Sequence, residues 1–145
     1  MIISDILSVK GNAEIISIES SQLLPEAVIK MVDRSVGSLV VMEQGTMVGI
    51  ITERDIMRIM RSKGCDIKDV KVSEIMSIEP IFGNPNDTVN YVRGVMTENH
   101  IRHLPVMDGD TLLGIISFHD VAKACLSEAK FENRLLKRYI RHWPE

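Results

Sequence analysis

The chain has 145 residues, enough for one ordinary domain or for two small domains that depend on each other. Its apolar fraction of 45% and charged fraction of 26% are typical of a globular protein and exclude a largely disordered chain. The net charge of −3 gives no general attraction to nucleic acid or to an anionic membrane.

Cysteine usage and the N-terminal residues bear on location. Cys65 and Cys125 form neither a CxxC pair nor a disulfide framework. The N-terminal sequence MIISDILSVKGNAE lacks the basic start and long apolar run of a signal peptide. No apolar run approaches the ~20 residues of a membrane helix. We therefore expect a cytoplasmic protein with reduced thiols that uses neither a membrane nor nucleic acid.

The first half of the chain predicts short strands that alternate with helices. An apolar run at 15–18 predicts a strand, and β-branched residues predict a hairpin of strands at 38–43 and 47–52 around Gln44 and Gly45. Between them, apolar residues recur with helical spacing and predict a helix packed on one face: Leu24, Ala27, Val28, Met31 and Val32.

A second helix is predicted over 53–64, with Gly64 at its C-terminal cap. Its inward residues are expected to be Ile56, Ile59 and Met60. The scarcity of aromatic residues, at 4%, means that Ile, Val, Leu and the nine Met build the core.

The second half repeats this order. It predicts a first strand near 81–82, a helix over 87–99 capped by Asn86 or Asp87, strands at 103–107 and 111–117 around a turn at 108–110, and a helix from 118. Each half is thus β-α-β-β-α. One half alone would be marginally stable, so the predicted fold is α+β, with two repeats packed sheet to sheet in pseudo-twofold symmetry.

A direct sequence match supports this duplication. GIITERDI at 49–56 returns as GIISFHDV at 114–121, at an offset of 65 residues. Upstream, DILS at 5–8 resembles EIMS at 74–77 at an offset of 69, so the first copy holds about four extra residues. We predict a first repeat with an N-terminal segment, a second repeat and a C-terminal helical tail, at 1–66, 67–128 and 129–145.

The repeated motif allows two interpretations. Thr52 and Ser117 fall where a strand meets a helix, and Asp55 and Asp120 follow three residues later, as in a capping box that only stabilises the helix. The same geometry also suits a ligand. A carboxylate in the first helical turn can accept hydrogen bonds from two vicinal hydroxyls, and the hydroxyl and helix N–H groups can bind a phosphate.

These residues carry a family resemblance. The two Gly-apolar-apolar-Thr/Ser-x-x-Asp motifs at 49–55 and 114–120, together with HIRHLPVMDGD at 100–110, resemble a tandem pair of CBS domains, also called a Bateman module. The resemblance covers roughly residues 5–127. It implies that the chain binds an adenosine-containing ligand (AMP, ADP, ATP, NAD(H) or S-adenosylmethionine) in clefts between the repeats.

The resemblance also implies roles for single residues. Asp55 and Asp120 would hold the ribose hydroxyls, with Thr52 and Ser117 near the sugar and phosphate. Basic residues would contact the phosphate: Arg54, Arg102, His103 and His119. The adenine slot would be apolar: Ile16, Ile18, Ile50, Ile81, Phe82 and Ile115. Each of these residues also has a plainer alternative, either core packing or a solvated cation.

The phosphate side differs between the repeats. Three of its four basic residues come from the second half, and the first-repeat partners of Arg102 and His103 are Gly37 and Ser38. We therefore expect one strong nucleotide site and one weaker or different one.

No catalytic or metal-binding arrangement stands out. His100 and His103 are three residues apart, but the chain is entering a strand there and no further Cys or carboxylate completes a metal site. No Ser-His-Asp or Cys-His pattern is evident. We expect no metal, no catalytic cofactor and no enzymatic activity.

The tail combines an apolar stripe with positive charge. The stripe is Phe131, Leu135, Leu136, Tyr139, Ile140 and Trp143, and the basic residues are Lys130, Arg134, Lys137, Arg138 and Arg141. The tail either docks on the module or on a dimer mate, or it grips a protein partner or an anionic surface. The predicted function is a regulatory nucleotide sensor that signals through a homodimer or an unidentified partner. The alternative is a protein-interaction scaffold with non-functional pockets.

Overall fold

The computed structural model describes residues 1–11 and 15–142. Their contacts divide the chain into two compact units. We call Glu14–Ile81 the first-repeat unit, and Met1–Ala13 together with Phe82–Glu145 the second-repeat unit. Each unit is described by itself below, and the expected sheet-to-sheet packing of the two repeats stays a prediction.

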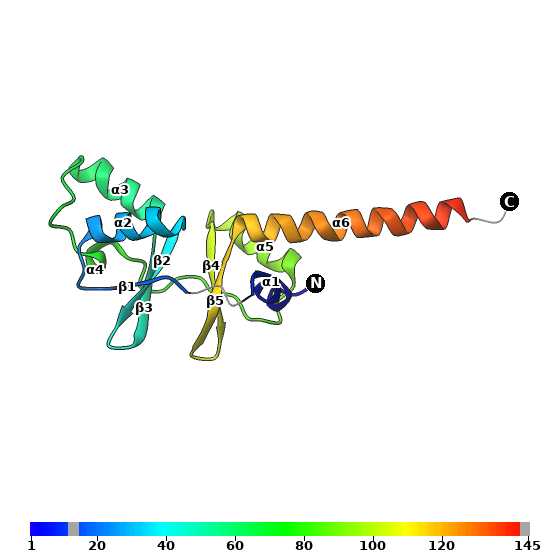
Figure 1. The fold of residues 1–145 in the computed structure, drawn as a ribbon, viewed down its shortest axis with the longest axis horizontal. Helices are drawn as coiled ribbons and strands as arrows, with labels where there is room; N and C mark the ends of the chain where they lie inside the picture. Colours follow the sequence, from blue (N-terminus) through cyan, green and yellow to red (C-terminus); the bar gives the residue numbers. More distant parts are fainter. Residues whose placement is uncertain (12–14, 143–145) are drawn as a thin grey trace. The chain divides into compact units, whose positions relative to one another are not determined.

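The first-repeat unit has the expected mixed architecture (Figure 1). Its sheet has the order β1-β2-β3, in which β1 runs parallel to β2 and β2 antiparallel to β3. Gln44 and Gly45, both with positive φ, form the two-residue hairpin turn. The elements are β1 (Ser17–Glu19), α2 (Leu24–Arg34), β2 (Ser38–Glu43), β3 (Thr46–Thr52), α3 (Glu53–Lys63) and α4 (Val72–Ile75).

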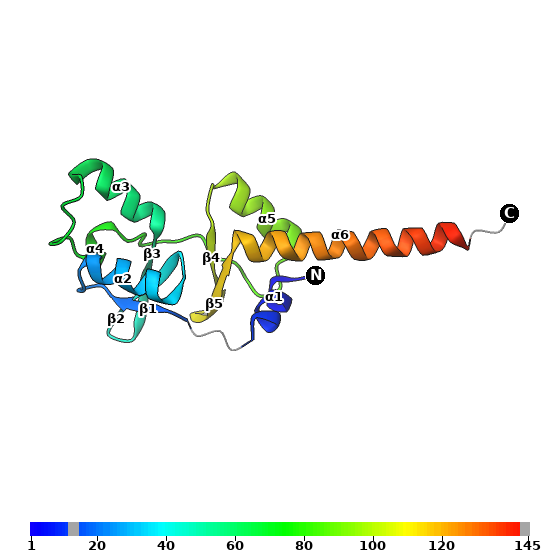
Figure 2. The same cartoon turned by 45° about the horizontal axis from the view of Figure 1, so that its top comes forward.

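The second-repeat unit contains the N-terminal helix and the last helix (Figure 2). Its hairpin matches the first one closely: each antiparallel pair shifts register once, between Val41 and Met42 and between Val106 and Met107. The elements are α1 (Ile3–Lys10), α5 (Val89–Glu98), β4 (His103–Asp108), β5 (Thr111–Ser117) and α6 (Phe118–Arg141).

The expected first strand of the second repeat is wrong. The described sheet there has two strands, and the third position is reduced to a single parallel bridge between Gly83 and Val106. Gly83 donates to Pro105 O and accepts from Met107 N, each at 2.9 Å. Pro80 and Pro85 flank this segment and have no N–H to extend the pairing.

Helix positions confirm the apolar patterns with two corrections. In α2, Leu24, Ala27 and Met31 are buried, but Val32 is 70% exposed. On a helical wheel Val32 lies about 100° from the centre of the buried stripe, which the sequence pattern alone did not reveal. In α3, Ile56 is buried and Ile59 packs against the core, whereas Met60 lies at the exposed edge.

The cap of α5 is a third correction. Thr88, and neither Asn86 nor Asp87, is the N-cap, and its hydroxyl accepts the N–H of Tyr91 at 3.1 Å. The carbonyl of Asp87 instead accepts the N–H of Ile3 at 2.9 Å, and its side chain accepts the N–H of Asn84. These bonds fix the N-terminal segment to the start of α5.

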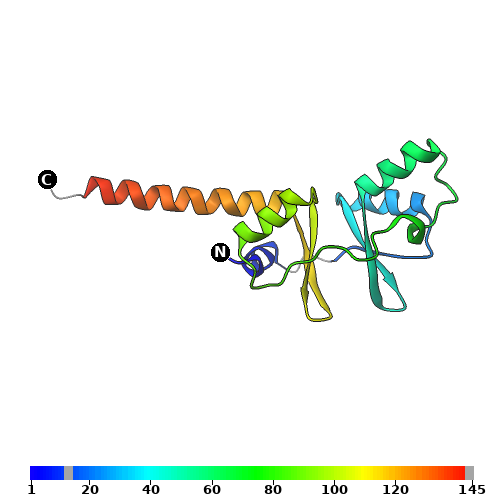
Figure 3. The ribbon, with the colours of Figure 1, turned by 180° about the vertical axis from the view of Figure 1, so that it is seen from behind.

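The two short helices α1 and α4 have equivalent places in different units. α1 packs in the core of the second-repeat unit through Ile3 and Ile6, and α4 packs in the first-repeat core through Val72. Figure 3 shows α1 beside α6 and β5. The N-terminal segment therefore packs with the second repeat, although the sequence division at 66/67 groups it with the first. The repeat boundaries themselves remain a prediction.

Helix α6 runs without a break from the second repeat into the tail. Its last residues are exposed, including Leu135, Leu136, Tyr139 and Ile140, so this part of the tail does not dock on its own unit. Trp143 lies outside the described residues. No helix of the described part is both long and apolar enough to cross a membrane.

Candidate functional site

The first repeated motif forms a complete capping box at the start of α3. Thr52 N donates to Asp55 Oδ2 at 2.8 Å, and Asp55 N donates back to Thr52 Oγ1 at 3.4 Å. The Thr52 hydroxyl also donates to Asp55 Oδ2 at 3.1 Å. The helix-capping interpretation is thus confirmed here, and the carboxylate is held at the positive end of the α3 dipole.

The second motif forms the same box at the start of α6. Ser117 N donates to Asp120 Oδ2 at 2.8 Å, and Asp120 N donates to Ser117 Oγ at 3.1 Å. Each junction therefore presents a hydroxyl, a carboxylate and a helix N-terminus, where the N–H groups of the first and third helical residues already donate to a carbonyl and to the capping hydroxyl. A capping role does not exclude a ligand, because the cap hydrogen bonds are accepted by Oδ2 and the other carboxylate oxygen, Oδ1, has two lone pairs of its own.

Strand pairing brings two predicted phosphate residues to the second junction. His103 pairs with Ser117 in the β4–β5 register, and the carbonyl of Arg102 accepts the N–H of Phe118 at 2.8 Å. At the first junction Ser38 pairs with Thr52, and the carbonyl of Gly37 accepts the N–H of Glu53 at 3.1 Å. The offset partners are thus structural equivalents, and the basic pair belongs to the second junction.

The other two predicted phosphate residues lie one position before each aspartate. Arg54 and His119 are both exposed in the first turn of their helices. Each shares a unit with one motif only: Arg54 with Asp55, and His119 with Asp120. The second junction therefore gathers three basic residues and the first gathers one.

The predicted adenine residues divide into core and surface. Ile18, at 2% exposure, is buried in the first-repeat core and Ile16 packs partly against that core, which supports the plainer alternative of core packing for these two. Ile50 is also buried, at 5% exposure, but it belongs to neither core cluster. Ile115 is half-buried. Ile81 and Phe82 are 41% and 57% exposed. Ile81 and Phe82 fall on opposite sides of the boundary between the units.

Sequence reasoning missed Lys10. Its ammonium lies 2.9 Å from Asp120 Oδ2 and donates to the carbonyl of Ile115 at 3.1 Å, so it contacts two predicted ligand-binding residues. Burial alone raises the pKa of the Asp120 carboxyl, but hydrogen bonds from Lys10 and Ser117 and the charge of Lys10 outweigh it and hold that pKa below its ordinary value. The spacing of 110 residues hid this contact.

The first junction has a weaker cation. Arg58 lies one turn along α3, and its Nη1 is 3.5 Å from Asp55 Oδ1. The Arg58 side chain is 75% exposed, against 33% for Lys10. An exposed pair three residues apart contributes little, so the two aspartates have different electrostatic surroundings.

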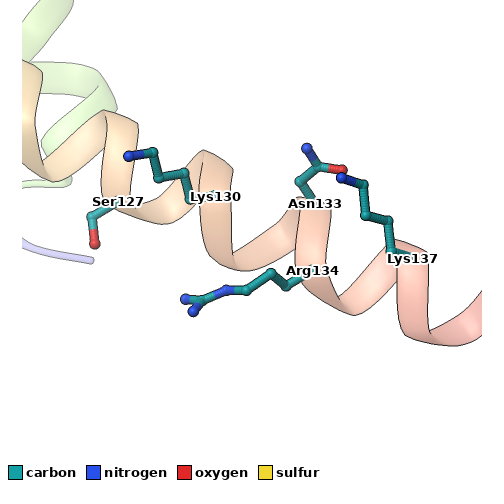
Figure 4. A pocket seen from close by; sticks show the side chains of 5 residues that line it. All are labelled: Ser127, Lys130, Asn133, Arg134 and Lys137. Atoms are coloured by element: carbon teal, nitrogen blue, oxygen red, sulfur yellow. The ribbon is translucent and has the colours of Figure 1, made fainter.

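Helix α6 carries a separate basic recess, shown in Figure 4. All of its lining residues come from this one helix: Ser127, Lys130, Asn133, Arg134 and Lys137. A single exposed helix surrounds a ligand on one side only. The recess is therefore a basic surface feature and differs from the concave, mostly apolar sites that bind small molecules.

The described residues contain no group of three or more His, Cys, Asp or Glu side chains that could hold a metal ion. His100 has positive φ and ends the turn before β4, where it is exposed. The chemistry available at the two junctions is therefore hydrogen bonding and charge, which suits recognition of hydroxyls and anions.

Comparison with known proteins agrees with this geometry. The CBS domain family model matches residues 3–62 and 72–127. The chain is 35% identical over 109 residues to the CBS domain-containing protein YhcV of Bacillus subtilis, covering 75% of this chain and 77% of that one. It is 36% identical to CBSX3, a mitochondrial CBS domain-containing protein of Arabidopsis thaliana, covering 95% and 71%.

Solved structures give the same result. The CBS-domain protein ATU1752 of Agrobacterium tumefaciens matches with a TM-score of 0.81 and 30% identity, covering 86% of this chain and 98% of that one. Protein MJ1225 of Methanocaldococcus jannaschii, described as an archaeal homologue of g-AMPK, matches with a TM-score of 0.73 and 27% identity, covering 85% and 47%. CBS-domain proteins are regulatory modules, and with two matched repeats this chain belongs to the CBS-domain family.

Proposed function

We propose that this protein is a regulatory module that binds an adenosine-containing nucleotide and signals occupancy to a partner or through its own dimer. The observation that carries the proposal is the duplicated junction: a Thr or Ser hydroxyl, an Asp carboxylate and a helix N-terminus, built the same way at Thr52–Asp55 and Ser117–Asp120. This set matches the chemistry of a ribose with an attached phosphate.

We assign the ribose hydroxyls to Asp55 and Asp120, and the phosphate to the basic residues around the junctions. Of the four predicted phosphate residues, Arg102, His103 and His119 belong to the second junction and Arg54 to the first. Unequal positive charge supports one tight and one weak site per chain. Adenine would contact the segments around Ile16, Ile50, Ile81, Phe82 and Ile115, whereas Ile18 is buried in the core.

Calorimetric titration tests this function directly. The purified chain is titrated with AMP, ADP, ATP, NADH and S-adenosylmethionine, and the stoichiometry is fitted. Micromolar binding of one of them at one per chain is the expected result. Two equal sites per chain would contradict the inferred asymmetry, and no binding to any of the five would remove the proposed function.

Asp120→Ala tests the ribose assignment. Loss of a charged hydrogen-bond acceptor costs about 1.5–3 kcal/mol, which corresponds to roughly 10–150-fold weaker binding. Asp55→Ala is the matched control, because it removes the equivalent cap at the other junction and is expected to weaken the tight site less. Wild-type affinity in Asp120→Ala would rule out a ribose role for this residue.

A second candidate function is a protein-interaction scaffold whose nucleotide pockets are not used. The exposed apolar residues of α6 favour it, since Phe131, Leu135, Leu136, Tyr139 and Ile140 are 48–71% exposed on one helix. Sedimentation of the wild type and of Leu136→Glu at several concentrations tests this surface, and a homodimer that the substitution dissociates would place the interface on α6. The nucleotide titration separates the two functions, since a scaffold with unused pockets binds none of the five ligands.

Two further properties belong to the proposal. A regulatory role with no catalytic activity fits the stand-alone CBS-domain relatives that match most of this chain. A cytoplasmic location with reduced thiols remains a prediction from the sequence, and Cys65 is exposed while Cys125 is half-buried.

A further inference from the structure

Lys10 is held at the second junction by the packing of its own helix. Ile3 and Ile6 of α1 are buried in the second-repeat core, and Leu7 lies against Gly114 in β5. Gly11, with a φ of 69°, ends the helix directly after Lys10. Lys10 therefore reaches Asp120 from a helix that is held in place by its packing, and its side chain is only 33% exposed.

The ammonium of Lys10 has hydrogen-bonding capacity to spare. It carries three N–H donors. Two go to Asp120 Oδ2 and to the carbonyl of Ile115. Within the described part of the chain no protein acceptor takes the third. Both Lys10 and Ser117 N donate to Asp120 Oδ2, so the carboxylate is oriented before any ligand arrives.

The first repeat has no cation at the position equivalent to Lys10. At the 69-residue offset that relates α1 to α4, Lys10 corresponds to Glu79, a residue of opposite charge. Asp55 instead has an exposed cation of its own helix, Arg58, at 3.5 Å. Lys10 therefore distinguishes the second junction from the first more sharply than the residues of the motif itself.

We propose that Lys10 and Asp120 together form a clamp for a ribose hydroxyl, which donates its proton to Asp120 Oδ1 and accepts the third N–H of Lys10. The inference rests on the proposed nucleotide function and assigns its ribose specificity to the second junction. A hydroxyl is both donor and acceptor, so an ammonium–carboxylate pair recognises it more fully than a carboxylate alone. Lys10 also positions Asp120, since its hydrogen bond to Oδ2 orients the carboxylate.

The test compares AMP with 2′,3′-dideoxy-AMP, which lacks both hydroxyls, by calorimetric titration of the full chain. In the wild type we expect AMP to bind at least ~10-fold more tightly than the dideoxy analogue. In Lys10→Met this ratio is expected to fall at least ~3-fold, because the remaining carboxylate no longer has its cationic partner. Lys10→Arg is expected to restore part of the ratio.

Controls separate a clamp from a structural role. A lysine that only held α1 in place would, when replaced, weaken both ligands equally and leave their ratio unchanged, which would overturn the inference. Lys130→Met, an exposed lysine farther along α6, is expected to keep the wild-type ratio. Lys10→Gln repeats the test if Lys10→Met fails to show a cooperative thermal transition.

The remaining outcomes are also decisive. Tighter AMP binding in Lys10→Met would show that the lysine competes with the ligand for Asp120, and would overturn the clamp. An unchanged ratio with AMP still bound removes the clamp and leaves the proposed function standing. If the wild type binds no AMP or related nucleotide, the proposed function and the clamp fail together.

Discussion

The two strand-to-helix junctions have the same cap and different cations. Thr52 with Asp55 and Ser117 with Asp120 form equivalent capping boxes at the same position of equivalent hairpins. Asp120 faces Lys10 of a helix 110 residues away in sequence, whereas Asp55 faces Arg58 of its own helix. The part of the motif that starts a helix is therefore duplicated, and the electrostatic surroundings of the carboxylate are not.

The motif glycines differ in the same way. Gly49 and Gly114 pair with Val41 and Val106 at matching positions of the two hairpins. A Cβ on Gly49 would lie 2.5 Å from the backbone oxygen of Ser77, but a Cβ on Gly114 would meet only Leu7 Cδ2 at 2.9 Å. At Gly49 a backbone atom leaves no room for a side chain. At Gly114 the obstacle is the end of a leucine side chain, which can move.

The largest expected effect comes from these glycines. Gly49→Ala forces backbone apart and is expected to destabilise the fold by about 2–3 kcal/mol, whereas Gly114→Ala moves one leucine and costs less than ~1 kcal/mol. Urea unfolding monitored by circular dichroism measures both. Equal losses would mean that the Ser77 segment yields as easily as Leu7.

The caps come next. Thr52→Ala and Ser117→Ala each remove the hydroxyl that accepts an aspartate N–H, and each is expected to cost ~1 kcal/mol of unfolding free energy. Thr52→Ser and Ser117→Thr keep the hydroxyl and serve as controls. A loss confined to one junction would contradict the structural equivalence of the two caps.

Low pH is expected to reduce the stability of the fold through Asp120 at the second junction. The pKa of Asp120 is lowered in the folded state, so folding favours its charged form. The resulting stability is fully present above the unfolded value of about 3.9 and is lost as pH falls through the lower folded value. Urea midpoints of the wild type and Asp120→Asn, measured from pH 6 to pH 2.5, should differ most above pH 4 and converge progressively as the pH falls further. A constant difference would exclude this linkage.

The smallest effect is expected at the first-junction cation. Arg58→Met removes an exposed ion pair at 3.5 Å and should change stability by less than ~0.5 kcal/mol. Lys10→Met removes a shorter and less exposed pair and should cost more, though below ~1 kcal/mol. Thermal unfolding at low and high salt compares them. A larger loss for Arg58 would reverse the ranking of the two junctions.

Local patterns predicted most of the fold. The hairpins, α2 and α3 follow from alternating or helical apolar spacing, and both capping boxes follow from Thr/Ser-x-x-Asp. The errors have two sources. Prolines on both sides of Gly83, a local signal, reduce that segment to one bridge, whereas a tertiary contact, the packing of α1 against Asp87, leaves Thr88 as the cap.

The candidate site was harder to predict because it depends on a tertiary contact. Asp120 and Ser117 are close in sequence, and their repetition identified them. Lys10 contacts Asp120 only because α1 packs in the second-repeat unit, and no periodicity within the first ten residues indicates that placement. The resemblance of DILS at 5–8 to EIMS at 74–77 was the available signal, because α1 and α4 hold equivalent places.

The packing of α1 in the second-repeat unit, and of α4 in the first, also governs the order in which the chain can fold. The first-repeat unit is contiguous, from Glu14 to Ile81, and its contacts can close as soon as that stretch leaves the ribosome. The second-repeat unit needs Lys10 and Asp120, which are 110 residues apart. At 5–20 residues per second, roughly 5–20 s separate their synthesis. Until the segment around Asp87 is made, the apolar face of α1 has no partner from its own unit, so the nascent second repeat is the part of the chain most exposed to misassembly and to chaperones.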